Sequence, residues 1–292
     1  MRAYSLRDSG VYRLFGEFGL TKEGKNGIIN ALTEKKLCIG TVITMQHRRR
    51  VSRISAMHFF KLALRSVLFL GACGIYIANR ILGLEDVFDE HQRFPWLLIL
   101  IWVIYAVEMA LRFFPSRLES PGCQKQFART YCPTGQDKPV IQPAWRTAVV
   151  AAVWLLLNAC IGALYLTELI DAGILILVSL AYGVCDMICI LFFCPFQTWL
   201  MKNRCCTDCR IYNWDFAMMF TPLILLPHWY TWSLLGLSLA LLLRWELTLR
   251  LHPERFSQAT NAAISCQNCT EKLCRHKRQL AAWIRDRKFI RR

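Results

Sequence analysis

Long apolar segments separated by short charged blocks are the feature that most constrains this chain. Each is close to the ~20 apolar residues that a helix needs to cross a hydrocarbon core of ~30 Å. A soluble domain of 292 residues would seldom be 55% hydrophobic with its charge confined to blocks. The sequence therefore predicts an all-α, polytopic integral membrane protein. The first four spans are expected over residues 59–82, 95–114, 145–170 and 173–193.

The apolar run over residues 214–250 is ambiguous, because it is long for one crossing and short for two. Pro222 and Pro227 interrupt it, and the aromatic stretch 228–232 is typical of an interfacial turn. Two helices over about 212–227 and 229–249 are the preferred interpretation, and one long helix is the alternative. The chain then comprises a basic arm (1–57), a six-helix membrane domain (58–250) and a basic tail (251–292).

Positive charge gathers on alternate connections of this six-span chain. Lys and Arg residues precede the first span, occupy the loops 115–144 and 194–213, and fill the tail, whereas the intervening connections are acidic or uncharged. The positive-inside rule then places both termini and these two loops in the cytoplasm of a multi-pass protein of the cell membrane. The net charge of +16 reflects this asymmetry. We find no nucleic-acid-binding motif and expect the lipid bilayer, not nucleic acid, as the partner.

Clustered cysteines lie on the same predicted side of the membrane. Thiols in the cytosol stay reduced, so such clusters indicate metal binding or catalysis more than disulfides. Cysteines inside the spans, at 73, 160, 185 and 189, are expected to be packing residues. The candidate metal ligands are the nine loop and tail cysteines: Cys123, Cys132, Cys194, Cys205, Cys206, Cys209, Cys266, Cys269 and Cys274.

Two Cys-x2-Cys steps, 206–209 and 266–269, suit tetrahedral thiolate ligation. We expect one site from Cys194, Cys206, Cys209 and a cysteine of loop 115–144, which leaves Cys205 spare. A second site would use Cys266, Cys269, Cys274 and either His276 or the remaining loop cysteine. Zinc and an iron–sulfur cluster both satisfy these ligands, although the ferredoxin spacings are absent. A structural zinc clip, a redox-active metal and no metal at all remain open.

Two carboxylates, Glu108 and Asp186, lie within predicted spans at a similar depth below the cytoplasmic surface. Ionisable residues at such depth are costly and mark functional candidates. They either line a proton or cation path or form structural pairs with Arg65, Arg112 or Arg244. Because Asp186 shares a helix face with Cys189, a mixed carboxylate–thiolate site is also conceivable.

The end of the tail, residues 275–292, combines Lys and Arg with a narrow apolar stripe. Such a segment is typical of an amphipathic helix that binds anionic lipid. The leading functional hypothesis is metal binding through cytoplasmic cysteines, with an electron-transfer or thiol-redox role. A transporter or ion-conducting protein, and an assembly factor that docks a soluble protein partner, are the alternatives. No nucleotide-binding or hydrolase motif is present, and whether the protein is an enzyme stays open.

Overall fold

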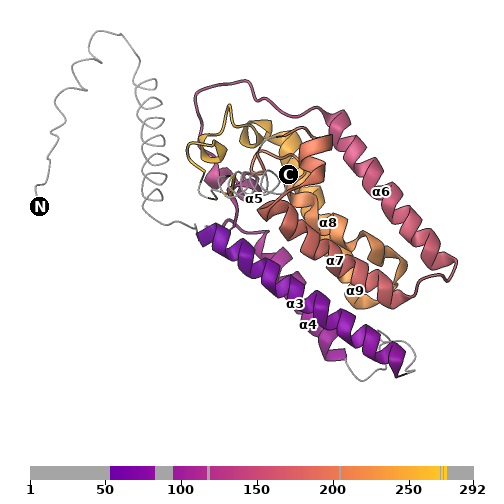
Figure 1. Ribbon diagram of the computed structural model, residues 1–292. Coiled ribbons are helices and arrows are strands. Elements are labelled where there is room, and N and C mark those ends of the chain that lie inside the picture. The colour runs from indigo at the N-terminus through magenta and orange to yellow at the C-terminus, as the bar shows by residue number, and fades with distance from the viewer. Residues whose placement is uncertain are drawn as a thin grey trace, which may run out of the picture. The chain divides into compact units, whose positions relative to one another are not determined.

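The computed structural model describes residues 53–82, 95–116, 119–203, 205–269, 271 and 273–274, all of which belong to one compact unit. This part of the chain is mostly helical and holds no strand, which confirms the expected all-α class. Its long helices are α3 (Arg53–Ile81), α4 (Pro95–Leu111), α6 (Ala144–Leu166), α7 (Ala172–Leu191) and α9 (Trp229–Leu251), and its short ones are α5 (Pro121–Gln124) and α8 (Asp215–Phe220) (Figure 1).

Three of these helices, α3, α6 and α7, are long and apolar enough to cross a membrane, and α4 is apolar but shorter. Large apolar side chains stand exposed along them, for example Val67 on α3 and Leu156 on α6, which are 67% and 68% exposed. A surface of this kind is unfavourable in water and suits lipid. Helix α3 begins at Arg53, several residues before the expected start of the first span.

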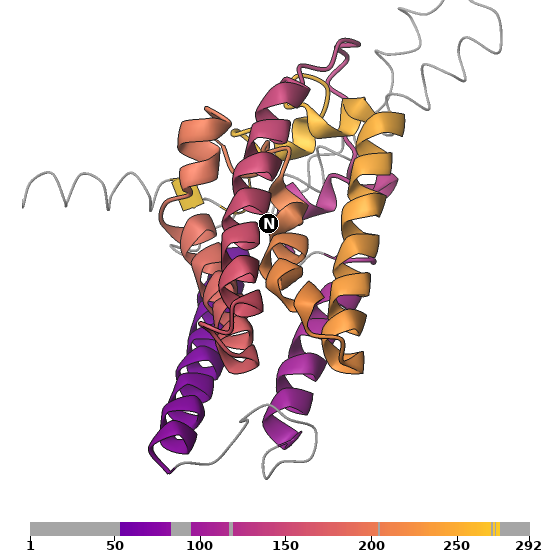
Figure 2. The ribbon, with the colours of Figure 1, turned by 90° about the vertical axis from the view of Figure 1, so that its right-hand side faces the viewer.

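The directions of the helices follow from contacts at their two ends (Figure 2). Near the end of α3, Arg80 pairs with Asp171, the N-cap of α7, so these two helices run antiparallel. Helices α4 and α9 run parallel: Trp102, midway along α4, bonds to Ser233 near the start of α9, and Phe113, just beyond α4, accepts a bond from Arg244 further along α9.

The chain between α7 and α9 is not the single helix expected over residues 212–227. It forms a 3-10 turn (Tyr212–Trp214), α8 and a second 3-10 helix (Thr221–Leu225) with Pro222 in its first turn. Pro222 lacks the N–H that a continued α-helix would need. Because a 3-10 helix rises ~2.0 Å per residue against ~1.5 Å for an α-helix, the two short helices over residues 215–225 together rise at most about 19 Å.

The apolar core lies where α3, α4, α7, α8 and α9 meet, and includes Tyr105, Met109 and Leu175, all fully buried. Helix α7 approaches α4 and α8 closely at Gly183. A Cβ atom there would lie 2.7 Å from the Tyr105 hydroxyl and 2.8 Å from the Met219 sulfur. Any larger residue at this crossing would force these two side chains to shift.

The tail beyond α9 folds back against the loop between α4 and α6. Backbone hydrogen bonds join Ala262 to Cys132 (2.7 Å) and Thr134 to Thr260 (3.2 Å). The Ser257 hydroxyl accepts a further bond from the Val140 amide at 2.9 Å. This pairing draws cysteine-bearing segments that are far apart in sequence to one end of the helices.

Candidate functional site

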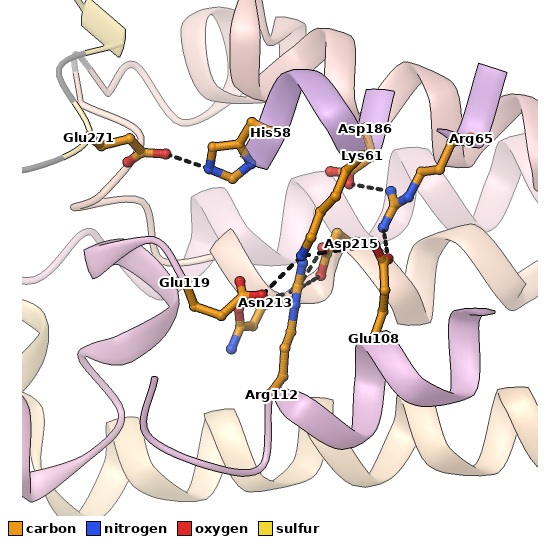
Figure 3. A network of polar contacts seen from close by, with 10 residues as sticks. All are labelled: His58, Lys61, Arg65, Glu108, Arg112, Glu119, Asp186, Asn213, Asp215 and Glu271. Atoms are coloured by element: carbon orange, nitrogen blue, oxygen red, sulfur yellow. Dashed lines mark hydrogen bonds and ion pairs between the residues drawn. The ribbon is translucent and has the colours of Figure 1, made fainter. Parts of the chain in front are cut away.

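One face of α3 bears a row of polar side chains that point into the interior of the protein. Ser55, His58, Lys61 and Arg65 recur every three or four residues, which places them on a single helical face, and all four are buried. Their partners come from α4, α7, the loop after α4 and the tail (Figure 3). We call this set the α3 polar face.

Arg65 is the last member of the α3 polar face along the helix, with only 1% of its side chain exposed. Its guanidinium lies 2.7 Å from Glu108 and 3.0 Å from Asp186, and it donates to the Gly183 carbonyl at 3.0 Å. The rings of Tyr105 and Phe216 flank it. A buried arginine needs such compensation, since an unpaired charge in this position would be very costly.

The two carboxylates expected to be functional thus meet at one arginine. Pairing with Arg65 was one of the structural alternatives that the sequence offered, whereas Arg112 and Arg244 take other partners. Arg112 lies 2.7 Å from Asp215, and Arg244 donates to the Phe113 carbonyl. The arrangement gives Glu108 and Asp186 a structural role in joining α3, α4 and α7.

Lys61 extends this network towards the loop after α4. Its Nζ lies 2.9 Å from Glu119 and 3.9 Å from Glu108. Burial alone would raise the pKa of Glu119, but Arg112 and Lys61 hold that pKa below its ordinary value. Glu119 is therefore ionised at neutral pH, and the cluster alternates positive and negative charges.

His58 joins the α3 polar face to the tail. Its Nε2 lies 2.9 Å from Oε1 of Glu271, whose other carboxylate oxygen accepts a bond from Ser120 at 3.0 Å. The Ser55 hydroxyl donates to the Glu271 backbone carbonyl at 2.6 Å. Glu271 lies 213 residues from His58 in the chain, so local sequence gives no sign of this pair. The regular spacing from Ser55 to Arg65 was the signal that this face is buried against polar groups.

A cavity of about 140 Å³ lies beside this network and is rich in sulfur. Asp186 and Asp215 form part of its wall, and Met218 and Met219 add thioethers. We call it the thiol cavity, because five cysteines line it: Cys185, Cys189, Cys194, Cys206 and Cys209.

The thiol cavity unites three residues that were expected to share a site, Cys194, Cys206 and Cys209. The further cysteines there are Cys185 and Cys189 of α7, which had been interpreted as packing residues, and not a cysteine of loop 115–144. A side-chain hydrogen bond joins Cys189 to Cys194. The i, i+4 spacing of the two helical cysteines, on the face of Asp186, was the available signal.

Lys125 stabilises the turn that contains Cys206 and Cys209 through hydrogen bonds to its backbone. This fully buried lysine donates to the carbonyls of Thr207 (3.0 Å) and Cys209 (2.9 Å). The Cys209 amide donates to the Cys206 carbonyl at 3.0 Å, which closes the expected Cys-x2-Cys turn. The Cys206 thiol donates to Gln197 at 3.0 Å, on the π-helical turn Phe196–Leu200.

The remaining candidate ligands lie apart from the thiol cavity. Cys123 is buried in α5 beside Arg112 and Asn213, and burial raises the pKa of its thiol to about 11. Cys132 is buried where the loop pairs with the tail. In the tail, Cys266 is exposed, Cys269 is half-buried, and Cys274 forms a side-chain hydrogen bond with Cys205.

The two four-ligand sites expected from the sequence are therefore only partly assembled. Nowhere among the described residues do three or more His, Cys, Asp or Glu side chains stand close enough to hold one metal ion. Burial raises the pKa of Cys209 to about 12, with Lys125 opposing the shift, so this thiol is protonated at neutral pH. Most of the basic arm, His276 and the segment 275–292 expected to bind anionic lipid lie outside the described residues.

No known family, no curated protein and no solved structure matches this chain. Its function must be inferred from the chemistry of the thiol cavity and the network beside it.

Proposed function

We propose that this membrane protein binds a thiophilic metal in the thiol cavity through cysteine thiolates. The observation that carries the proposal is the meeting of five thiols and two carboxylates around one space of about 140 Å³. Thiolate and thioether sulfur favours zinc, copper(I) and iron–sulfur clusters over hard cations. Metal binding would displace thiol protons and draw the cysteines inward.

The charges around the cavity support this assignment. Asp186 forms an ion pair with Arg65 at 3.0 Å, and Asp215 forms one with Arg112 at 2.7 Å. Lys125 lies under the turn that bears Cys206 and Cys209. These buried cations would offset the negative charge of several thiolates, which lowers the free-energy cost of ligation.

Zinc and an iron–sulfur cluster share this thiolate chemistry but imply different roles. Zinc would pin α7 to the turn at 206–209 and act structurally. A cluster would give an electron-transfer role at the membrane surface. Ion conduction through Glu108 and Asp186 is less well supported, because both carboxylates are engaged in ion pairs with Arg65.

We also propose six membrane crossings with the thiol cavity at the cytoplasmic side. Helices that cross in alternating directions are supported by two features. Helices α4 and α9 run parallel, and the stretch 215–228 leads from one end of the helices to the start of α9 at the other end. The positive charge of the cysteine-bearing loops supports the orientation. A reporter fused after Arg292 should be active only in the cytoplasm, and an external reporter signal would overturn this topology.

Metal analysis of protein purified without oxygen tests the metal proposal. We expect stoichiometric metal: iron with acid-labile sulfide and visible absorption for a cluster, or zinc without colour. Cys194→Ser with Cys206→Ser should lose it, whereas Cys160→Ser, an exposed cysteine of α6 outside the cavity, should retain it. Protein without metal, or full metal retention in the double variant, would overturn the proposal.

A further inference from the structure

A second sulfur site, outside the thiol cavity, is formed by Cys205 and Cys274. The Cys205 sulfur lies 2.9 Å from the Thr207 hydroxyl, and the Cys205 side chain is buried. Further hydrogen bonds reach it from the Cys274 thiol and from the amides of Thr207 and Asp208. Four donors therefore converge on one sulfur atom.

Such convergence stabilises a thiolate, which is the reactive form of cysteine. The Cys274 side chain is one of the groups bonded to the Cys205 sulfur, so the two sulfurs are in contact. A thiolate beside a thiol is the arrangement from which a disulfide forms after oxidation.

The two sulfurs are held by separate parts of the fold. Asn203 clamps the Cys205 backbone, accepting from its amide at 3.2 Å and donating to its carbonyl at 2.9 Å. Glu271, three residues before Cys274, is bound by His58 and Ser120. The contact between the Cys205 and Cys274 sulfurs is therefore made by two segments, the turn and the tail, which are anchored by different residues.

We propose that Cys205 and Cys274 form a peroxide-reactive dithiol, with Cys205 as the nucleophile and Cys274 as the resolving thiol. Residue Cys205 is 8% exposed, which favours an oxidant as small as hydrogen peroxide over a bulky disulfide. Neither Cys205 nor Cys274 lines the thiol cavity, although Cys205 directly precedes the cavity residue Cys206.

The reaction balances in two steps. The Cys205 thiolate attacks one peroxide oxygen, the O–O bond breaks, and the released hydroxide takes a proton to become water. Cys274 then loses its proton and attacks the Cys205 sulfenic acid, which forms the disulfide and releases a second water. The two thiols supply two electrons, and the peroxide is reduced to two waters. The product covalently links the turn to the tail.

Wild-type protein provides the first test, without any substitution. After one equivalent of hydrogen peroxide, free thiols are alkylated and the tryptic peptides are mapped. We expect the peptide 205–210 to be linked to the peptide 273–275, with two thiols lost per peroxide. The proposal is overturned if Cys205 and Cys274 are both still alkylated after peroxide treatment. A metal bound to the two thiols would also leave them unoxidised, and so would give this result.

Variants assign the two roles. In Cys274→Ser the sulfenic acid on Cys205 should accumulate and react with dimedone, because no resolving thiol remains. In Cys205→Ser the oxidation of Cys274 should slow at least tenfold. Cys266→Ser, an exposed cysteine of the same tail, should behave as wild type. Variants are compared only where their elution on size exclusion matches wild type. Equal oxidation of Cys274 in Cys205→Ser and wild type would contradict the assignment.

Discussion

The guanidinium of Arg65 on α3 lies 3.0 Å from the carboxylate of Asp186 on α7, deep inside the helix bundle. Replacing Arg65 by Met should leave Asp186 buried without its ion-pair partner, and Glu108 with only the more distant Lys61, at 3.9 Å. Breaking a buried pair in this way costs about 3–5 kcal/mol. We expect a large fall in the thermal unfolding temperature in detergent, measured by fluorescence-detected size exclusion.

The same two helices provide the control. Arg80→Ala removes another α3–α7 ion pair, with Asp171, but Arg80 is exposed to solvent and its loss should hardly change the unfolding temperature. Adding Glu108→Gln and Asp186→Asn to Arg65→Met should recover part of the loss, because the uncompensated charges are then removed. Equal effects of Arg65→Met and Arg80→Ala would contradict this account.

Gly183→Ala should destabilise the protein by about 1–3 kcal/mol, as overpacking of a tight core does. The added methyl group would press on the Tyr105 hydroxyl and the Met219 sulfur, and would disturb the carbonyl that Arg65 binds. Gly236→Ala on α9 is the matched control, because no atom lies within 4 Å of its added Cβ. Thermal unfolding of both variants checks the difference, and an unchanged Gly183→Ala protein would refute the tight crossing.

Lys125 should make stability depend on pH. Burial lowers its pKa to about 8 in the folded protein, against ~10.4 in an unfolded chain. Between these values the unfolded chain binds more protons, so stability rises with pH by up to ~1.4 kcal/mol per unit. The stability of wild type relative to Lys125→Met should therefore increase from pH 8 to pH 10. The opposing ionisation of Cys123 is present in both proteins, whereas that of Cys209 depends in part on Lys125 itself.

Glu271→Ala should release the tail from α3. The substitution removes the carboxylate that binds His58 and Ser120, and hydrogen bonds to a buried charge are worth about 1.5–3 kcal/mol each. Limited trypsin digestion should then cut the tail several-fold faster. Glu254→Ala, at a partly exposed residue of the same tail, should leave the cleavage rate unchanged. Equal cleavage in the two variants would show that Glu271 does not anchor the tail.

Much of the helical framework could be predicted because it rests on local composition. The apolar windows located α3, α4, α6, α7 and α9 to within several residues. The stretch 215–225 could not be predicted, because its change from α to 3-10 geometry depends on Pro222 and on packing against other helices. Length and hydropathy do not distinguish these two geometries.

The site was harder to predict, since its contacts join distant parts of the chain. Spacing correctly grouped Cys194, Cys206 and Cys209, and it placed Cys189 on the helix face of Asp186, but it gave no reason to join Cys189 to the other three. The pairing of His58 with Glu271 crosses 213 residues of sequence. Such partners can be identified only from the structure, in which the tail folds back and brings Glu271 to His58 on α3.

The burial of Arg65 also has a consequence for how the protein is made. Its carboxylate partners follow 43 and 121 residues later in the chain, so α3 leaves the ribosome long before Asp186 exists. An arginine at the centre of a lone helix disfavours insertion into lipid by ~2.5–3.5 kcal/mol. We therefore expect stable integration of α3 to depend on α4 and α7, which supply Glu108 and Asp186 as partners of Arg65.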